Sequence, residues 1–188
     1  MKEDRMPEIP AEQWSEAQKQ AAEQFATQRK TGVFGPFVPL LRSPEVMLRA
    51  AALGDYLRFR NVLPLKVSEM VILLTARHWT QQYEWNYHYP LAIKAGLATE
   101  KAEALAEGRR PAAMDNEEET AYEFCCELHA NHGVSDTTYA RALQLFGEQG
   151  AIDLVALTGY YSLLAMVMNT ARTALPKDAK PALPLLPQ

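Results

Sequence analysis

The sequence predicts an all-α fold, and three observations support that prediction. Glycine is scarce, with 9 in 188 residues, and the glycines fall where helices would end. Polar residues that favour helix N-caps, such as Ser43, Asp115 and Ser135, precede stretches rich in helix-forming residues. Apolar residues cover most of the circumference of the stretch 65–79, which is typical of a helix buried in the core of a helical bundle.

The N-terminal third predicts two helices with an irregular segment between them. Residues 11–30 are rich in alanine, glutamine and glutamate and predict a helix. The segment TGVFGPFVPLLRSPE, residues 31–45, is expected to be extended because two glycines and two prolines interrupt it before Ser43. Ser43 is the expected N-cap of a helix that carries Pro44 in its first turn and runs to about Arg60.

The rest of the chain predicts a series of helices that begin at polar N-caps or after a proline and end near glycines. They cover 65–79 after Pro64, 81–95 after Thr80, a short helix from Thr99 to Gly108, a helix from Asp115 to His132, a helix that starts at Ser135, and 151–175. Asp115 is followed three residues later by Glu118, which completes a capping-box pattern. Residues 176–188 contain four prolines and predict a tail that packs on a surface or lacks regular structure.

Composition and charge limit the possible functions. The chain is long enough for one domain with a core, and 48% hydrophobic and 22% charged residues are ordinary for a soluble globular protein. A net charge of −4 argues against binding of nucleic acid, which needs a basic surface. No apolar run approaches the roughly 18 residues of a membrane span, and the start MKEDRMPEIP lacks the apolar core of a signal peptide.

The two cysteines, Cys125 and Cys126, are adjacent, and neighbouring cysteines rarely form a disulfide. They are expected to be free thiols in a reducing compartment, so a cytoplasmic location is expected. The chain has no CxxC motif of the kind that holds zinc or forms a redox dithiol. Neither a metal nor a cofactor is therefore expected.

One cluster of residues suggests acid–base chemistry. Glu84 and His88 are four residues apart, so a helix places them on one face, flanked by Gln81 and Trp85. A carboxylate beside an imidazole favours the charged ring and raises its pKa, which makes an acid–base pair. The alternative is an ordinary surface pair, with Trp85 and its neighbouring tyrosines serving only as core aromatics.

Glu69 lies in the preceding predicted helix among strongly apolar neighbours. A carboxylate in such a place is costly unless it is paired, so Glu69 is expected to point at Glu84 and His88 across a helical hairpin. Two carboxylates that share one site would raise the pKa of one of them and give a protonated acid near neutral pH. The alternative is that Glu69 only stabilises the start of its helix. The remaining histidines, His78, His129 and His132, share no spacing and are expected to be structural or solvated.

The stretch 64–105, PLKVSEMVILLTARHWTQQYEWNYHYPLAIKAGLATEKAEAL, resembles the core repeat of the carboxymuconolactone decarboxylase family, which shares its fold with AhpD-type alkylhydroperoxidases. Glu69 and His88 fit the family's glutamate and histidine, while the two cysteine positions of the peroxidase branch hold Gln81 and Glu84. The motif EWNYHYPLA is similar to the decarboxylase-like branch, and residues 157–176 resemble the closing helix of longer members.

The resemblance implies an AhpD-like helical bundle with a central helical hairpin over residues 35–176. Residues 1–34 would then be an N-terminal helical extension and residues 177–188 a proline-rich tail. Family members form trimers or hexamers, so a homo-oligomer is expected, with a dimer as the smaller alternative. The segment GVFGPFVPLLRSPE is expected to cover the pocket.

The resemblance also implies a cofactor-independent lyase, a decarboxylase, or an isomerase that acts on a small lactone or unsaturated carboxylic acid. His88 would donate the proton, Glu69 would hold His88 or relay the proton, and Tyr83 and Trp85 would shape an apolar pocket. A substrate carboxylate would bind an arginine, for which the candidates are Arg58, Arg60 and Arg77. Dithiol peroxidase chemistry needs two thiols, which Gln81 and Glu84 do not supply. The alternative function is a non-catalytic protein of the same fold that binds a small ligand or serves in assembly.

Overall fold

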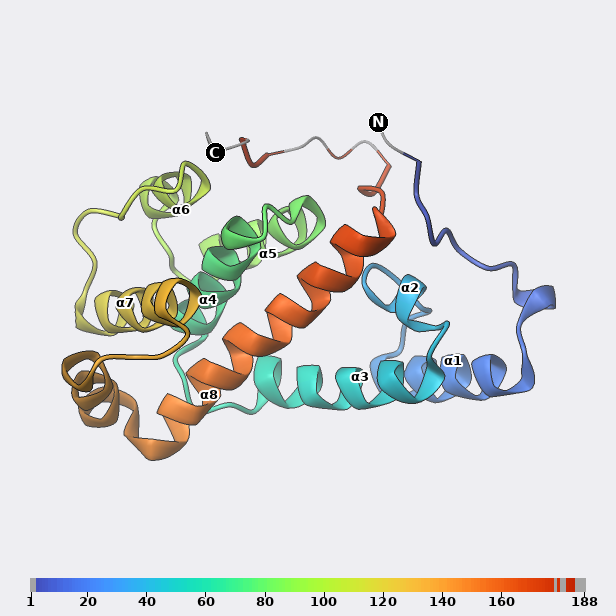
Figure 1. Ribbon diagram of the computed structural model, residues 1–188, viewed down its shortest axis with the longest axis horizontal. Helices are drawn as coiled ribbons and strands as arrows, with labels where there is room; N and C mark the ends of the chain where they lie inside the picture. Colours follow the sequence, from blue (N-terminus) through green and yellow to red (C-terminus); the bar gives the residue numbers. More distant parts are fainter. Residues whose placement is uncertain (1–2, 178, 180–181, 185–188) are drawn as a thin grey trace.

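The computed structural model describes residues 3–177, 179 and 182–184, and every regular element in this part of the chain is helical (Figure 1). A short 3-10 turn at Ala11–Gln13 precedes the α-helices, which are α1 (Glu16–Arg29), α2 (Phe37–Leu40), α3 (Pro44–Phe59), α4 (Leu65–His78), α5 (Gln82–Lys94), α6 (Thr99–Ala106), α7 (Asn116–Asn131) and α8 (Asp136–Ala171). The prediction of an all-α protein is confirmed.

Helix α4 forms the centre of the core. All residues from 67 to 77 are buried, and α4 packs against α5, α6, α7 and α8. The three residues 79–81 join α4 to α5, and the two helices form a packed hairpin that α8 crosses (Figure 1). Helices α1 and α3 pack side by side and extend the bundle beyond this hairpin (Figure 1).

Several predicted element boundaries are wrong in the first half of the chain. The helix expected at 11–30 is interrupted, because α1 begins only after Ser15, whose side chain and that of Gln18 form a capping box. The segment 31–45 is not fully extended, because Phe37–Leu40 forms the short helix α2. Proline is compatible with such a turn, since the first N–H groups of a helix have no intrahelical partner.

Two predicted N-caps are also wrong. Thr80 adopts a left-handed backbone with φ 48°, and Gln81 caps α5 instead by accepting hydrogen bonds from the backbone N–H groups of Tyr83 and Glu84. Ala98, and not Thr99, is the N-cap residue of α6. In contrast, the capping box of Asp115 with Glu118 and the cap at Ser135 are confirmed.

Helix α8 joins two predicted helices and breaks at Gly147. This glycine has φ 68° and ψ 179°, a conformation available almost only to glycine. The helix ends at Ala171 instead of Leu175, with Arg172 in a left-handed cap. By length and composition α8 could cross a membrane, but 56% of its most apolar window is buried inside the fold, and core helices of soluble proteins pass the same test.

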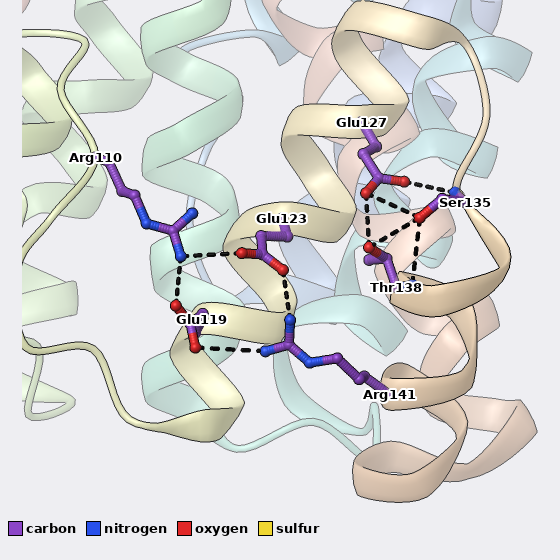
Figure 2. Close-up of polar contacts among 7 residues, drawn as sticks. All are labelled: Arg110, Glu119, Glu123, Glu127, Ser135, Thr138 and Arg141. Atoms are coloured by element: carbon purple, nitrogen blue, oxygen red, sulfur yellow. Dashed lines mark hydrogen bonds and ion pairs between the residues drawn. The ribbon is translucent and has the colours of Figure 1, made fainter.

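A polar network fixes the start of α8 and the connection before α7 to the surface of α7 (Figure 2). Arg110 and Arg141 both bind Glu119 and Glu123. One turn further on, the carboxylate of Glu127 accepts hydrogen bonds from the backbone N–H and the hydroxyl of Ser135 and, at 2.6 Å, from the hydroxyl of Thr138. Isolated exposed ion pairs stabilise little, but charges that share partners in a network contribute more.

The tail docks on the start of α5. The Gln82 side chain donates a hydrogen bond of 2.8 Å to the Leu183 carbonyl and accepts from the N–H groups of Ala182 and Leu183. Arg77 donates to the Pro184 carbonyl at 2.7 Å, and the Leu183 side chain is buried. For residues 182–184 the predicted packing on a surface is therefore observed, while 178, 180–181 and 185–188 lie outside the described residues.

Candidate functional site

The central hairpin brings Glu69 and His88 together. Glu69 lies in the buried run of α4 and His88 on the facing side of α5, and the Glu69 Oε2 atom is 2.8 Å from His88 Nδ1. Their side chains are only 6% and 5% exposed. A carboxylate can only accept at this contact, so Nδ1 carries the proton and the neutral ring keeps Nε2 as its acceptor.

Glu84 lies in the same helix as His88 but is not its partner. The residue is buried, and neither carboxylate oxygen has a hydrogen-bond partner among the described residues. Burial raises the pKa of Glu84 well above its usual value, which favours the neutral acid. The expectation that Glu69 would cause this shift is not supported, because burial alone accounts for it.

The expectation that Glu84 charges His88 is wrong. Burial lowers the pKa of His88, and this effect exceeds the opposing effect of its hydrogen bond to Glu69, while the nearby Arg58 lowers the pKa further. The i,i+4 spacing places Glu84 and His88 on one face of α5, but the hydrogen-bond partner of His88 comes across the hairpin. The site therefore favours a neutral acid and a neutral imidazole.

Glu84 and His88 line a small inner cavity of about 40 Å³. This volume has room for about three water molecules. Its wall comes from α5, α8, α3, the end of α1 and the segment around α2, and consists of Arg29, Phe34, Pro36, Phe37, Arg58, Tyr83, Glu84, Tyr87, His88, Tyr160, Tyr161 and Leu164.

Two guanidinium groups line the inner cavity, and one of them has no direct ion pair in the described part of the chain. Arg29 is paired with Asp55 at 2.8 Å and donates to the Ala51 carbonyl at 2.9 Å. Arg58 has no carboxylate within 4.0 Å among the described residues, and its guanidinium lies 5.5 Å from the ring centre of Tyr87. At the cavity Arg58 therefore has no direct ion pair with a described residue, although it interacts at longer range with the Glu69 carboxylate behind His88. A guanidinium without a direct ion pair suits an anionic ligand.

The tyrosines of α8 contribute neutral hydroxyl groups. Burial raises the pKa of Tyr160 to about 12 and raises the pKa of Tyr161 well above its usual value. Their hydroxyls therefore stay protonated at neutral pH. Gly54 is required for this arrangement, because a Cβ there would lie 2.2 Å from the Tyr160 hydroxyl oxygen.

A larger outer hollow of about 480 Å³ adjoins the inner cavity and is more open to solvent. It is lined by Gln28, Arg29, Thr31, Phe34, Asp55, Arg58, Phe59, Arg60 and Tyr87. Four of these residues, Arg29, Phe34, Arg58 and Tyr87, also line the inner cavity. The two spaces are therefore neighbours that share one wall.

Of the predicted site residues, Glu84, His88, Tyr83 and Arg58 line the inner cavity, and Glu69 lies behind His88 as its hydrogen-bond partner. The others lie elsewhere.

Gln81 caps α5 and donates to the Asn169 side chain at 3.0 Å. Trp85 is buried and faces a different hollow beside Tyr89. Arg60 lies only in the outer hollow, and Arg77 binds the backbone carbonyls of Ala106 and Pro184.

Sequence reasoning missed Arg29, Tyr160 and Tyr161. Each comes from a helix distant in sequence from the hairpin, and no local pattern marks them. The predicted covering segment is observed in part, since Phe34, Pro36 and Phe37 line the cavity. Gly35 at φ 52° lets this segment approach Tyr83, whose ring a Cβ would meet at 2.8 Å.

A third hollow of about 320 Å³ lies between α4, α6 and α7, and its described residues do not combine a buried acid with an imidazole as those of the inner cavity do. Its imidazoles, His78 and His129, stack with ring centres 4.1 Å apart, and burial lowers the pKa of both. Within the part of the chain that the structure describes, no carboxylate lines it.

The thiols are not activated either. Burial raises the pKa of Cys125 to about 12 and also raises that of Cys126. Within the described ranges, no three histidines, cysteines or acidic residues gather in a way that could hold a metal ion.

The inner cavity is therefore the candidate site, because among the hollows formed by the described residues it is the one where a buried acid, an imidazole and a carboxylate partner meet at one wall. A comparison with protein-family models and a comparison with curated proteins gave no match for this chain.

Proposed function

We propose that the protein is a cofactor-independent enzyme that uses acid–base catalysis on a small organic acid, as a lyase (decarboxylase) or an isomerase. The observation that carries the proposal is the pair of Glu69 and His88 at the wall of a cavity that also holds the unpartnered acid Glu84. Perturbed titratable groups gathered in a cavity are typical of active sites.

Each of the three residues has a distinct role in this proposal. Glu69 accepts the Nδ1 proton of His88 and so holds the ring in one tautomer, which leaves Nε2 to act as general base. Glu84, held as the neutral acid, donates a proton to carbon. This reverses the expectation from the sequence, in which His88 was the donor.

The role of Glu84 as proton donor serves either reaction, and the role of His88 as base serves the isomerisation. In an isomerisation, His88 takes a proton from a carbon next to a carbonyl group, and Glu84 returns one at a different carbon. In a decarboxylation, the bond to the carboxylate breaks, CO₂ leaves, and the electron pair moves toward a conjugated carbonyl before Glu84 protonates the carbon. The Tyr160 and Tyr161 hydroxyls are available to stabilise the developing oxyanion.

The substrate class follows from the charge of the wall. Arg58 supplies a guanidinium that has no direct ion pair among the described residues, and a guanidinium binds carboxylates in a planar, two-pronged geometry. The apolar side chains of Phe34, Phe37 and Leu164 exclude water and favour loss of charge from the ligand. A small lactone or unsaturated acid that carries a carboxylate fits this description.

The AhpD-like fold, membership of the carboxymuconolactone decarboxylase family, a cytoplasmic location and a homo-oligomeric state are also part of the proposal. The observation that supports an oligomer is a row of exposed apolar side chains on α8, formed by Ile152, Val155, Leu163 and Met166. Exposed apolar rows at helical spacing favour contact with another helix.

A second candidate is a non-catalytic protein that binds a small ligand. The inner cavity favours it in one respect, since about 40 Å³ is too small for a lactone ring in this conformation. Catalysis would require the covering segment or the Tyr87 side chain to move.

The test is a spectrophotometric screen of lactones and unsaturated carboxylic acids with purified wild-type protein. Glu84→Gln should abolish turnover of any substrate found, and His88→Gln should abolish isomerisation, while both leave the far-ultraviolet circular dichroism unchanged. Glu148→Gln, an exposed glutamate on α8, is the matched control and should keep full activity. Full activity in His88→Gln would remove the imidazole from the mechanism.

A further inference from the structure

The outer hollow carries charge that the fold does not neutralise. It holds three arginines, Arg29, Arg58 and Arg60, and one carboxylate, Asp55, which is already paired with Arg29. Arg58 and Arg60 have no carboxylate within 4.0 Å among the described residues. In a chain of net charge −4, two guanidinium groups without a direct ion pair in one hollow form a local anion-attracting region.

Aromatic rings separate this region from the catalytic groups. Phe34 and Tyr87 stack with ring centres 6.2 Å apart and an angle of 26° between their planes. The guanidinium of Arg58 lies 5.5 Å from the ring centre of Tyr87, and all three residues line both spaces. A ligand that spans the two spaces must therefore pass this partition, with Arg58 beside it.

Because the two spaces differ in size, they can hold different parts of one ligand. The inner cavity of about 40 Å³ admits only a few heavy atoms next to His88, while the outer hollow of about 480 Å³ has room for the rest of a small molecule. Arg60 reaches only the outer hollow, so its charge cannot serve a group bound beside His88.

We propose that the outer hollow is a second anion-binding subsite, in which Arg60 and Arg58 hold a terminal oxyanion group of a ligand whose other end enters the inner cavity. The preferred ligand thus carries an oxyanion at each end of a short carbon chain, and the distal group is a carboxylate or a phosphoryl group. The statement that the ligand reacts at the end bound in the inner cavity rests on the proposed function. The binding preference itself does not.

The experiment is isothermal titration calorimetry of the full chain with butyrate, glutarate and 4-phosphonobutyrate, which share a carboxylate at one end and differ at the other. Glutarate or 4-phosphonobutyrate should bind at least roughly tenfold more tightly than butyrate, as one charge-assisted contact predicts. The tighter of the two identifies the distal group.

Arg60→Gln should remove this preference while changing butyrate affinity less than about twofold. Arg49→Gln is the matched control, because Arg49 is an exposed arginine on α3, the helix that ends directly before Arg60, and it should leave all three affinities unchanged. Equal binding of the three probes by the wild type, no binding of the two-headed probes, or a preference retained in Arg60→Gln would overturn the proposal.

The two proposals fail independently. His88→Gln should keep the preference for two-headed anions, since His88 does not line the outer hollow. A clear preference together with no turnover in any screen would refute the enzymatic proposal and leave the subsite intact.

Discussion

Replacement of Glu84 by glutamine tests the central electrostatic claim through stability, without knowledge of a substrate. The Glu84 side chain is buried, and its carboxyl oxygens have no hydrogen-bond partner in the described part of the chain. Glutamine has nearly the same shape but does not titrate. The difference in unfolding free energy between the wild type and Glu84→Gln therefore isolates the cost of ionising this one carboxyl group.

The sign and size of the pH dependence of stability follow from the raised pKa of Glu84. In the unfolded chain the carboxyl group titrates near its ordinary value of 4.5, while in the folded protein its pKa is well above this. The folded state then holds a proton that the unfolded state has lost, so wild-type stability falls as pH rises from about 4.5 through the folded pKa. The loss cannot exceed the linkage limit of roughly 1 to 1.5 kcal/mol per pH unit for one proton, and it continues with rising pH only until the folded carboxyl group ionises.

The assay is urea unfolding followed by circular dichroism at several pH values between 5 and 7. Relative to the wild type, Glu84→Gln should gain stability steadily as pH rises, while the exposed control Glu148→Gln should track the wild type. Titration of His88 is common to both proteins and largely cancels. A difference between wild type and Glu84→Gln that does not change with pH would show that Glu84 ionises freely, and the reasoning would be refuted.

Three further predictions concern other parts of the fold. Gly54→Ala should lose about 1–3 kcal/mol of unfolding free energy, because its Cβ would lie 2.2 Å from the Tyr160 hydroxyl oxygen. Gly159→Ala, whose Cβ would meet nothing within 4 Å, should keep its stability or gain up to about 1 kcal/mol. Thermal unfolding measures both variants, and equal losses would contradict the packing argument. Burial lowers the pKa of His129 from 6.5 to about 4, so the folded state binds fewer protons than the unfolded state between these pH values. The free energy of unfolding should therefore fall as pH drops from 6.5 to 4, by about 1–2 kcal/mol after allowance for partial exposure. His129→Asn should reduce this pH dependence, and an unchanged pH dependence would contradict the prediction. Burial raises the pKa of the Cys125 thiol to about 12, so this thiol should not react with Ellman's reagent in the native protein at pH 8. Cys125→Ser should therefore leave the number of reactive thiols unchanged. A smaller number in the variant would show that the Cys125 thiol is accessible.

The elements that could be predicted from sequence are those with local causes. Asp115 with Glu118 and Ser135 begin helices because their side chains satisfy the free N–H groups of the first turn, and this chemistry needs only neighbouring residues. Thr80 fails as a cap because the chain turns there with a positive φ, which depends on how α5 packs back on α4. The short helix α2 was missed because its prolines lie at positions where a helix tolerates them.

The candidate site likewise has a part that the sequence predicts and a part that depends on the packing of distant helices. Burial of Glu69, Glu84 and His88 near one another follows from the cost of placing carboxylates in an apolar helix hairpin. The choice of partner does not follow, since His88 pairs with Glu69 across the hairpin and not with Glu84 along the helix. Arg29 and Tyr161 could not be predicted, because only the packing of α1 and α8 brings them to the cavity.

The hydrogen-bonded pair and Glu84 all come from the continuous hairpin 69–88, whereas Phe34, Pro36 and Phe37 close the cavity from a separate stretch of chain. Mutations in that separate stretch can reshape the opening without disturbing the hairpin, so the two parts can diverge at different rates during evolution. Because Pro36 and Phe37 are buried and Phe37 packs on Phe25 in the core, Phe34 is the closing position at which variation would reshape the opening with the least disturbance of the fold.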